Sequence, residues 1–201
     1  MQNIFLSGYL LGNVYKNLGI NYQYIDYLSY NSYEDLKKDV KGEYNVAIGY
    51  SLGGRILLRL ISEGHIKVKK LYIVGAPYYV HSTPDFPYGM KVKTFRNLRH
   101  LITGIPEIIF NSVLKLLYNV KLVPSPNWSR EKIKYWYGFL AEYFPIKTPY
   151  PETIIIHGKK DFIVDFKNAT YLQKKLKAKL IPLDTGHIIF PSRLKKFIKE
   201  F

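Results

Sequence analysis

Short apolar runs alternate with segments of helical periodicity along most of this chain, and this alternation restricts the possible folds more than any other feature. An apolar run of strand length, bounded by polar residues or glycine, is typical of a strand buried on both faces. Strands alternating with helices favour a parallel sheet that is covered by helices. We therefore predict an α/β fold with a mainly parallel six-stranded sheet, whose strands lie at residues 3–7, 22–28, 45–50, 70–75, 153–157 and 178–183.

One long interval breaks the alternation between the fourth and fifth predicted strands, at residues 76–152. Helices are predicted here over residues 91–103 and 107–119 and from Ser129, as the N-cap, to Tyr143, with breaks at Pro84, Pro87, Pro124 and Pro126. We expect residues 1–201 to form a single domain in which residues from about 77 to about 150 form a helical cap over the sheet.

The composition narrows the function classes. The chain has 30 basic and 15 acidic side chains, a net charge of +15, which favours an acidic partner. The lysine clusters at residues 67–70 and 174–179 are short and typical of solvated faces, so we do not expect nucleic acid as the partner. With no cysteine, neither disulfides nor a cysteine nucleophile are available. The sequence contains no apolar stretch of membrane-spanning length and no positive region before Ile4, so we expect no membrane association and a cytoplasmic protein.

The strongest chemical signal is the run Gly49-Tyr50-Ser51-Leu52-Gly53, followed by Gly54. It falls where the third predicted strand meets an apolar helical pattern, which is the context of a G-x-S-x-G nucleophile elbow. A sharp turn there exposes the Ser51 hydroxyl, and the flanking glycines avoid collisions with neighbouring backbone. The alternative is a serine helix cap beside packing glycines. We predict that Ser51 is a nucleophile.

A serine nucleophile needs a base and an orienting carboxylate, here expected in the chain order Ser, Asp, His. Asp161 follows the fifth predicted strand and His187 follows the sixth, so both belong at the sheet edge that carries Ser51. Asp165, a candidate helix N-cap, and Asp184 are the alternative acids. The remaining histidines do not follow the last strand: His65, His81, His100 and His157. We predict the triad Ser51, His187 and Asp161, which requires no metal and no cofactor.

Stabilising a tetrahedral intermediate requires backbone N–H donors near the nucleophile. The amide of Leu52 lies at the predicted helix N-terminus, where unpaired donors favour a negative oxygen. The second donor is expected from the loop after the first strand, where Ser7 and Gly8 precede Tyr9. We predict an oxyanion hole formed by the amides of Leu52 and Tyr9.

These motifs resemble the α/β-hydrolase superfamily over the whole chain, through Gly49 to Gly53, the segment from His157 to Asp161 followed by Val164, and Gly186-His187. Within it, residues 50–54, 74–77 and 86–89 are similar to the elbow and the cap entry of the pimeloyl-acyl carrier protein methyl ester esterases of biotin synthesis. The chain departs from that pattern in having Ser7-Gly8 where His-Gly is usual. It also starts at the strand that is third in the family, so the N-terminal hairpin is expected to be absent.

The resemblance implies a serine carboxylesterase that releases methanol from pimeloyl-acyl carrier protein methyl ester. An acyl carrier protein is acidic, and the predicted cap is basic. Arg96 and Arg99 lie one helical turn apart and are candidate contacts for carboxylates or phosphate, with a solvated helix face as the alternative. The oligomeric state is left open, with a monomer as the expectation. Apolar cap residues either line an acyl tunnel or pack the cap on the sheet: Leu98, Ile102, Ile109, Leu116, Trp136 and Phe139.

Three alternatives remain at this point. A carboxylesterase or lipase for free small esters would share the triad but would be indifferent to a carrier protein. An acyl-thioesterase or acyl transferase would use the same triad with another substrate or acceptor. A non-catalytic nucleic-acid-binding protein on a hydrolase scaffold would explain the charge but not the Ser, His and Asp.

Overall fold

The computed structural model describes residues 2–82, 86–104, 128–147 and 149–198, and it contains one six-stranded sheet in the order β2-β1-β3-β4-β5-β6. The strands are β1 (Gln2–Leu6), β2 (Gln23–Ile25), β3 (Gly42–Tyr50), β4 (Ile66–Val74), β5 (Glu152–Gly158) and β6 (Lys179–Leu183). All neighbouring strands pair in parallel, so the expected mainly parallel sheet is parallel throughout the described residues. Strand β2 lies on one side of β1, whereas β3 and the later strands lie on the other side. The strand order therefore changes direction between β1 and β3, and ligands of open α/β sheets bind at such a position.

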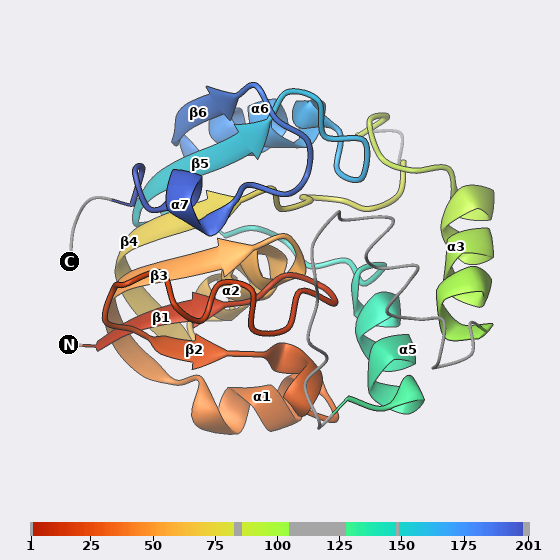
Figure 1. Ribbon diagram of the computed structural model, residues 1–201, viewed down its shortest axis with the longest axis horizontal. Coiled ribbons are helices and arrows are strands. Elements are labelled where there is room, and N and C mark those ends of the chain that lie inside the picture. The colour runs from red at the N-terminus through yellow and green to blue at the C-terminus, as the bar shows by residue number, and fades with distance from the viewer. Residues whose placement is uncertain (1, 83–85, 105–127, 148, 199–201) are drawn as a thin grey trace.

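Helices cover the sheet as the alternation predicts. They are α1 (Tyr33–Asp39), α2 (Leu52–Ser62), α6 (Phe166–Leu176) and the short α7 (Pro191–Leu194), with a 3-10 turn, η1, at Tyr27–Ser29. Helix α2 packs on β1, β3 and β4, and α6 packs on β5 and β6. In Figure 1, α2 and α6 lie behind the sheet and α7 lies in front of it. Ser32 caps α1, since its hydroxyl accepts the Asp35 N–H at 3.1 Å.

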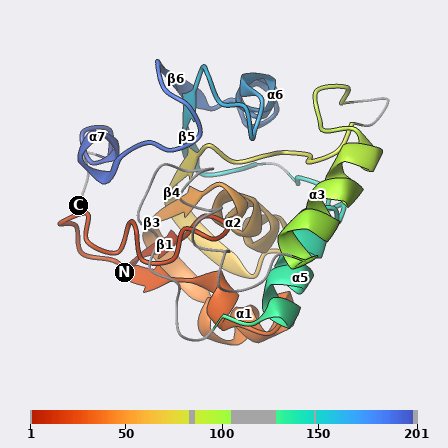
Figure 2. The ribbon, with the colours of Figure 1, turned by 45° about the vertical axis from the view of Figure 1, so that its right-hand side comes forward.

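The predicted cap contains two helices within the described residues, α3 (Val92–Gly104) and α5 (Arg130–Phe139). They pack against each other, and both lie beyond the carboxyl ends of the strands (Figures 1 and 2). Ser129 caps α5 as expected, because its hydroxyl accepts the Lys132 N–H. The helix ends at Phe139 and not at Tyr143, which corrects the predicted boundary. The predicted helix at residues 107–119 and the prolines at 84, 124 and 126 lie outside the described residues.

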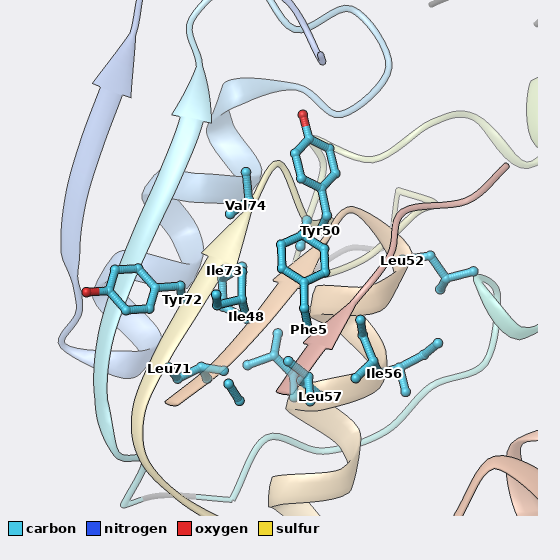
Figure 3. Packing of buried hydrophobic residues seen from close by; sticks show 14 of the residues in the cluster. Phe5, Ile48, Tyr50, Leu52, Ile56, Leu57, Leu71, Tyr72, Ile73 and Val74 are labelled. Carbon is cyan, nitrogen blue, oxygen red and sulfur yellow. The ribbon is translucent and has the colours of Figure 1, made fainter. Parts of the chain in front are cut away.

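The centre of the core surrounds β1, β3 and β4, and α2 covers one face of these strands. The side chains of Phe5, Ile48 and Ile73 from the sheet, and of Ile56 and Leu57 from α2, are fully buried there. Figure 3 shows them clustered beneath Tyr50, whose hydroxyl points away from the cluster at the end of β3. Burying apolar side chains of this size contributes about 1.5–3 kcal/mol each, so the core holds the turn after β3 in a fixed position.

Candidate active site

The turn between β3 and α2 has the backbone geometry of a nucleophile elbow. Ser51 has φ 49° and ψ −119°, a conformation that L-residues rarely adopt. A Cβ on Gly49 would come within 2.4 Å of Gly54 Cα, and one on Gly53 would come within 2.3 Å of the Ser7 carbonyl oxygen. The glycines therefore allow the backbone to pass close to β1 while the turn presents the Ser51 side chain at the sheet edge.

The structure brings Ser51 and His187 together although 135 residues separate them in the sequence. The distance from His187 Nε2 to Ser51 Oγ is 3.2 Å, within hydrogen-bonding reach. Both residues are almost completely buried, with Ser51 8% exposed. In this environment the imidazole can accept the serine proton without competition from bulk water.

Asp161 occupies the other side of the imidazole. Its Oδ2 lies 2.7 Å from His187 Nδ1, so it favours the tautomer that leaves Nε2 free to accept a proton from Ser51. Its Oδ1 accepts the backbone N–H groups of Ile163 at 2.9 Å and Val164 at 2.8 Å. Burial opposes the charged form, but hydrogen bonds from the two histidines, His157 and His187, outweigh it and hold the pKa of Asp161 well below its ordinary value. The carboxylate is ionised at neutral pH.

Two buried residues that the sequence did not single out as site residues support this arrangement. Tyr50 donates its hydroxyl hydrogen to the His187 carbonyl oxygen at 2.6 Å and accepts the Ile189 N–H at 2.8 Å. His157 places Nε2 3.2 Å from Asp161 Oδ2. Their positions in the sequence could have identified them. Tyr50 immediately precedes Ser51, and His157 is the last residue of the predicted fifth strand, four residues before Asp161.

The residues predicted as oxyanion donors belong to α2 and to the loop after β1. Leu52 is the first residue of α2, and Tyr9 follows β1 on the neighbouring strand. The Tyr9 hydroxyl donates to the Ile133 carbonyl oxygen of α5 at 2.9 Å, so this loop also contacts the cap. The use of the Leu52 and Tyr9 amides as an oxyanion hole stays a prediction.

The alternative acids have other partners. Asp165 is the N-cap of α6 and accepts the Lys167 N–H at 2.8 Å, as the sequence suggested. Asp184 is paired with Lys160 at 2.9 Å on the surface. These contacts favour Asp161 over both alternative acids.

Two of the other histidines also have partners away from Ser51. His65 contacts the Lys37 carbonyl oxygen, and His81 packs on Phe95.

The cap residues named from the sequence divide between surface and packing positions. Arg96 is exposed on α3 and Arg99 is partly buried on the same helix. Trp136 and Phe139 are buried, and the Trp136 indole donates to the Tyr30 carbonyl oxygen at 3.0 Å, so these two rings pack α5 on the segment after β2. Leu98 is partly buried. Ile109 and Leu116 lie outside the described residues, and the side chain of Ile102 does as well.

Neither a candidate metal site nor a membrane-spanning helix occurs in the part of the chain that the structure describes. In residues 2–82, 86–104, 128–147 and 149–198, no three or more His, Asp or Glu side chains are arranged to hold a metal ion. No helix in these ranges combines the length and apolar character needed to cross a bilayer.

Comparisons with known proteins agree with the fold. The chain is 24% identical to the AB hydrolase superfamily protein YisY of Bacillus subtilis (strain 168), across 82% of this chain and 70% of that protein. It superposes on the esterase EaEST from Exiguobacterium antarcticum with a TM-score of 0.75 and 22% identity, covering 98% of this chain and 89% of the esterase. A bromoperoxidase from Bacillus anthracis gives a TM-score of 0.70 and 15% identity, with 98% and 87% covered.

No protein-family model matches the sequence. The structural likeness nevertheless shows that the chain has the α/β-hydrolase fold, which confirms the predicted fold class. The sequence likeness to YisY supports placement in the α/β-hydrolase superfamily. The narrower resemblance to the pimeloyl-acyl carrier protein methyl ester esterases stays a prediction.

Proposed function

We propose that this protein is a serine esterase that cleaves carboxylic esters through an acyl-enzyme on Ser51. The observation that carries the proposal is the continuous contact from Ser51 Oγ to His187 Nε2 at 3.2 Å and from His187 Nδ1 to Asp161 Oδ2 at 2.7 Å. A hydroxyl, an imidazole and a carboxylate in this order form the arrangement that activates serine in acyl transfer. The esterase fold of EaEST is consistent with this chemistry.

The proposed reaction has two steps. Ser51 Oγ attacks the ester carbonyl carbon while His187 Nε2 takes its proton, and the oxyanion is bound by the amides of Leu52 and Tyr9. Collapse of this intermediate breaks the bond to the alcohol, which leaves with the proton from His187. Water, deprotonated by His187, then attacks the acyl carbon. When this second intermediate collapses, the bond to Ser51 Oγ breaks, His187 returns the proton to Ser51 Oγ, and the acid is released. Throughout, the ionised Asp161 orients the imidazole and stabilises its positive charge.

A fluorophosphonate probe tests the first part of this proposal. We expect the probe to label Ser51 in the wild-type protein and not in Ser51→Ala. The same substitution should abolish turnover of a short-chain p-nitrophenyl ester, because it removes the attacking oxygen. Ser51→Ala should unfold at nearly the wild-type temperature, since only one hydroxyl is lost. Turnover by the variant close to that of the wild type would contradict the proposal.

As the physiological substrate we propose the methyl ester of pimeloyl-acyl carrier protein, cleaved to the free acid and methanol in biotin synthesis. This is supported by the motif resemblance and by the basic side chains of α3, Lys93, Arg96 and Arg99, in a helix whose own sequence contains no Asp or Glu. The helix lies beyond the carboxyl ends of the strands (Figures 1 and 2), and Ser51 directly follows the carboxyl end of β3. A positive surface there would attract an acidic carrier protein.

Comparison of two substrates separates this function from hydrolysis of free small esters. The protein is assayed with pimeloyl methyl ester on acyl carrier protein and with the corresponding free methyl ester. A higher kcat/KM for the carrier-bound ester is expected, because long-range attraction accelerates its association. Equal values would favour a general carboxylesterase, and faster cleavage of an acyl thioester than of either ester would favour a thioesterase. Growth of a biotin-requiring strain that lacks its own esterase gives the biological check.

A further inference from the structure

His157 is a completely buried histidine that the reaction above does not use. It belongs to β5 and is 0% exposed. Its Nε2 lies 2.8 Å from the Val164 carbonyl oxygen and 3.2 Å from Asp161 Oδ2. Its Nδ1 has no hydrogen-bond partner among the described residues. The ring packs edge-on to Phe166, with 5.9 Å between the ring centres.

These contacts define the protonation state of the ring. A carbonyl oxygen only accepts hydrogen bonds, so the nitrogen that faces Val164 must carry the proton. A second proton on Nδ1 would leave a buried, charged N–H without an acceptor among the described residues, which is unfavourable. His157 is therefore neutral, with its hydrogen on Nε2.

A neutral His157 leaves the charge of Asp161 available for His187. Oδ1 of the carboxylate is already held by the amides of Ile163 and Val164. Oδ2 is approached by two imidazoles, His157 at 3.2 Å and His187 at 2.7 Å. The N–H of His157, which the Val164 carbonyl oxygen shares, thus adds a second favourable contact to Oδ2 without neutralising the carboxylate.

We propose that His157 is a positioning residue, which aims Asp161 Oδ2 at His187 Nδ1 through its Nε2–H. This inference rests on the proposed serine esterase function, because it assigns His157 a role through the acid of that triad. It predicts an effect on kcat and on the ionisation of His187, with little effect on KM, since His157 itself does not face a substrate.

Two variants of similar size test the proposal. His157→Gln keeps an N–H donor near the position of Nε2, whereas His157→Met keeps the volume and removes the donor. We expect kcat for a p-nitrophenyl ester to fall about tenfold in His157→Met, the equivalent of one hydrogen bond to a charged group, and about threefold or less in His157→Gln. In His157→Met the acid limb of the profile of kcat/KM against pH should shift to higher pH, because a carboxylate with one donor fewer is more basic and favours the protonated His187.

Equal losses in the two variants, with unchanged pH profiles, would overturn the proposal and leave His157 as a packing residue. A measurement on the wild-type protein guards against a variant that fails to fold. Nitrogen-15 NMR of the histidine rings should show His157 protonated on Nε2 and unprotonated on Nδ1, and the opposite tautomer would also overturn the proposal. If the fluorophosphonate probe fails to label wild-type Ser51, the proposed esterase function fails and this inference fails with it. A labelled wild type with indistinguishable variants contradicts the role of His157 alone.

Discussion

At the scale of single residues, Tyr50 connects the nucleophile turn to the loop that carries His187. Its side chain is fully buried, donates to the His187 carbonyl oxygen and accepts the Ile189 N–H. Tyr50→Phe keeps the ring and leaves both backbone groups without this partner. We expect kcat to fall about five- to tenfold and the free energy of unfolding to fall by about 1–2 kcal/mol. Steady-state kinetics and urea unfolding measure the two effects.

Tyr15→Phe is the matched control for this change. The Tyr15 ring stacks on Tyr50 at 4.5 Å, and its equally buried hydroxyl donates to the Ile189 carbonyl oxygen at 3.0 Å. Its loss should destabilise the protein to a similar extent but change kcat less, because the contact is two residues beyond His187. If both variants lose the same fraction of kcat, Tyr50 has no particular role in placing His187.

The carboxylate of Asp161 makes the stability of the protein depend on acidic pH. Its pKa in the folded protein lies below its ordinary value, so the unfolded chain binds more protons in this range and stability rises with pH. The Asp161 carboxylate therefore makes its full contribution to the free energy of unfolding above about pH 5. This contribution is lost as the pH falls below about 4. We expect the free energy of unfolding to fall less between about pH 6 and about pH 3.5 in Asp161→Asn than in the wild type. Identical pH dependence in urea unfolding would show that Asp161 is not stabilised as an anion.

At the scale of secondary-structure elements, a buried arginine joins α2 to both ends of the cap. The Arg55 guanidinium donates to the carbonyl oxygens of Tyr78, before α3, and of Glu142, after α5. It also lies over the Phe144 ring, 4.8 Å from the ring centre. Burial lowers the pKa of Arg55 to about 10, so the group stays charged at neutral pH. The cap is therefore attached one helical turn after Ser51.

Substitution of Arg55 should loosen this attachment. Arg55→Met leaves two carbonyl oxygens without their donor, and we expect the free energy of unfolding to fall by about 2–4 kcal/mol, with faster proteolysis inside the cap. Arg59→Met is the control on the next turn of α2, where the guanidinium pairs with Glu63 at 2.8 Å and Glu142 at 2.6 Å. A partly exposed pair of this kind contributes about 1 kcal/mol or less. Equal losses would argue against a special role of Arg55.

The ends of the elements show where local patterns were insufficient. The apolar runs located every strand, but β3 and β4 begin earlier than predicted, because Gly42, Glu43 and Tyr44 pair with the polar start of β4. Helix α5 ends earlier than predicted. The Ala141 and Glu142 amides bond to the carbonyl oxygens three residues before them, and the Glu142 carbonyl oxygen turns to Arg55. Both boundaries depend on partners that are distant in the sequence.

At the scale of the whole molecule, the net charge of +15 should steer an acidic carrier protein to the basic side of α3. We expect kcat/KM for the carrier-bound ester to fall about tenfold or more between about 0.05 M and about 0.5 M salt, and kcat/KM for the free methyl ester to change little. The combined substitution of Arg96→Glu and Arg99→Glu should lower the first value by a similar factor and spare the second.

A charge change elsewhere provides the control for this prediction. Lys174→Glu with Lys175→Glu alters the net charge equally, in the last turn of α6, which lies behind the sheet (Figure 1). If this pair reduces use of the carrier-bound ester as much as the α3 pair does, the effect comes from the total charge and α3 is not the contact surface. Salt-independent kinetics with both esters would remove the acidic partner from the proposal.

The sequence alone determined the features that depend on neighbours along the chain. The alternation of apolar runs and helical segments predicted the α/β fold, the glycines around Ser51 predicted the elbow, and the order Ser51, Asp161, His187 predicted the triad, because these signals come from local sterics and from the parallel arrangement of successive strands. Three contacts became apparent only from the folded chain: His157 approaches Asp161, Tyr50 holds the His187 loop, and Arg55 joins the two ends of the cap. These are hydrogen bonds made by buried side chains whose partners lie on other loops and strands, and no pattern within a single segment specifies which groups will face each other once the chain has packed.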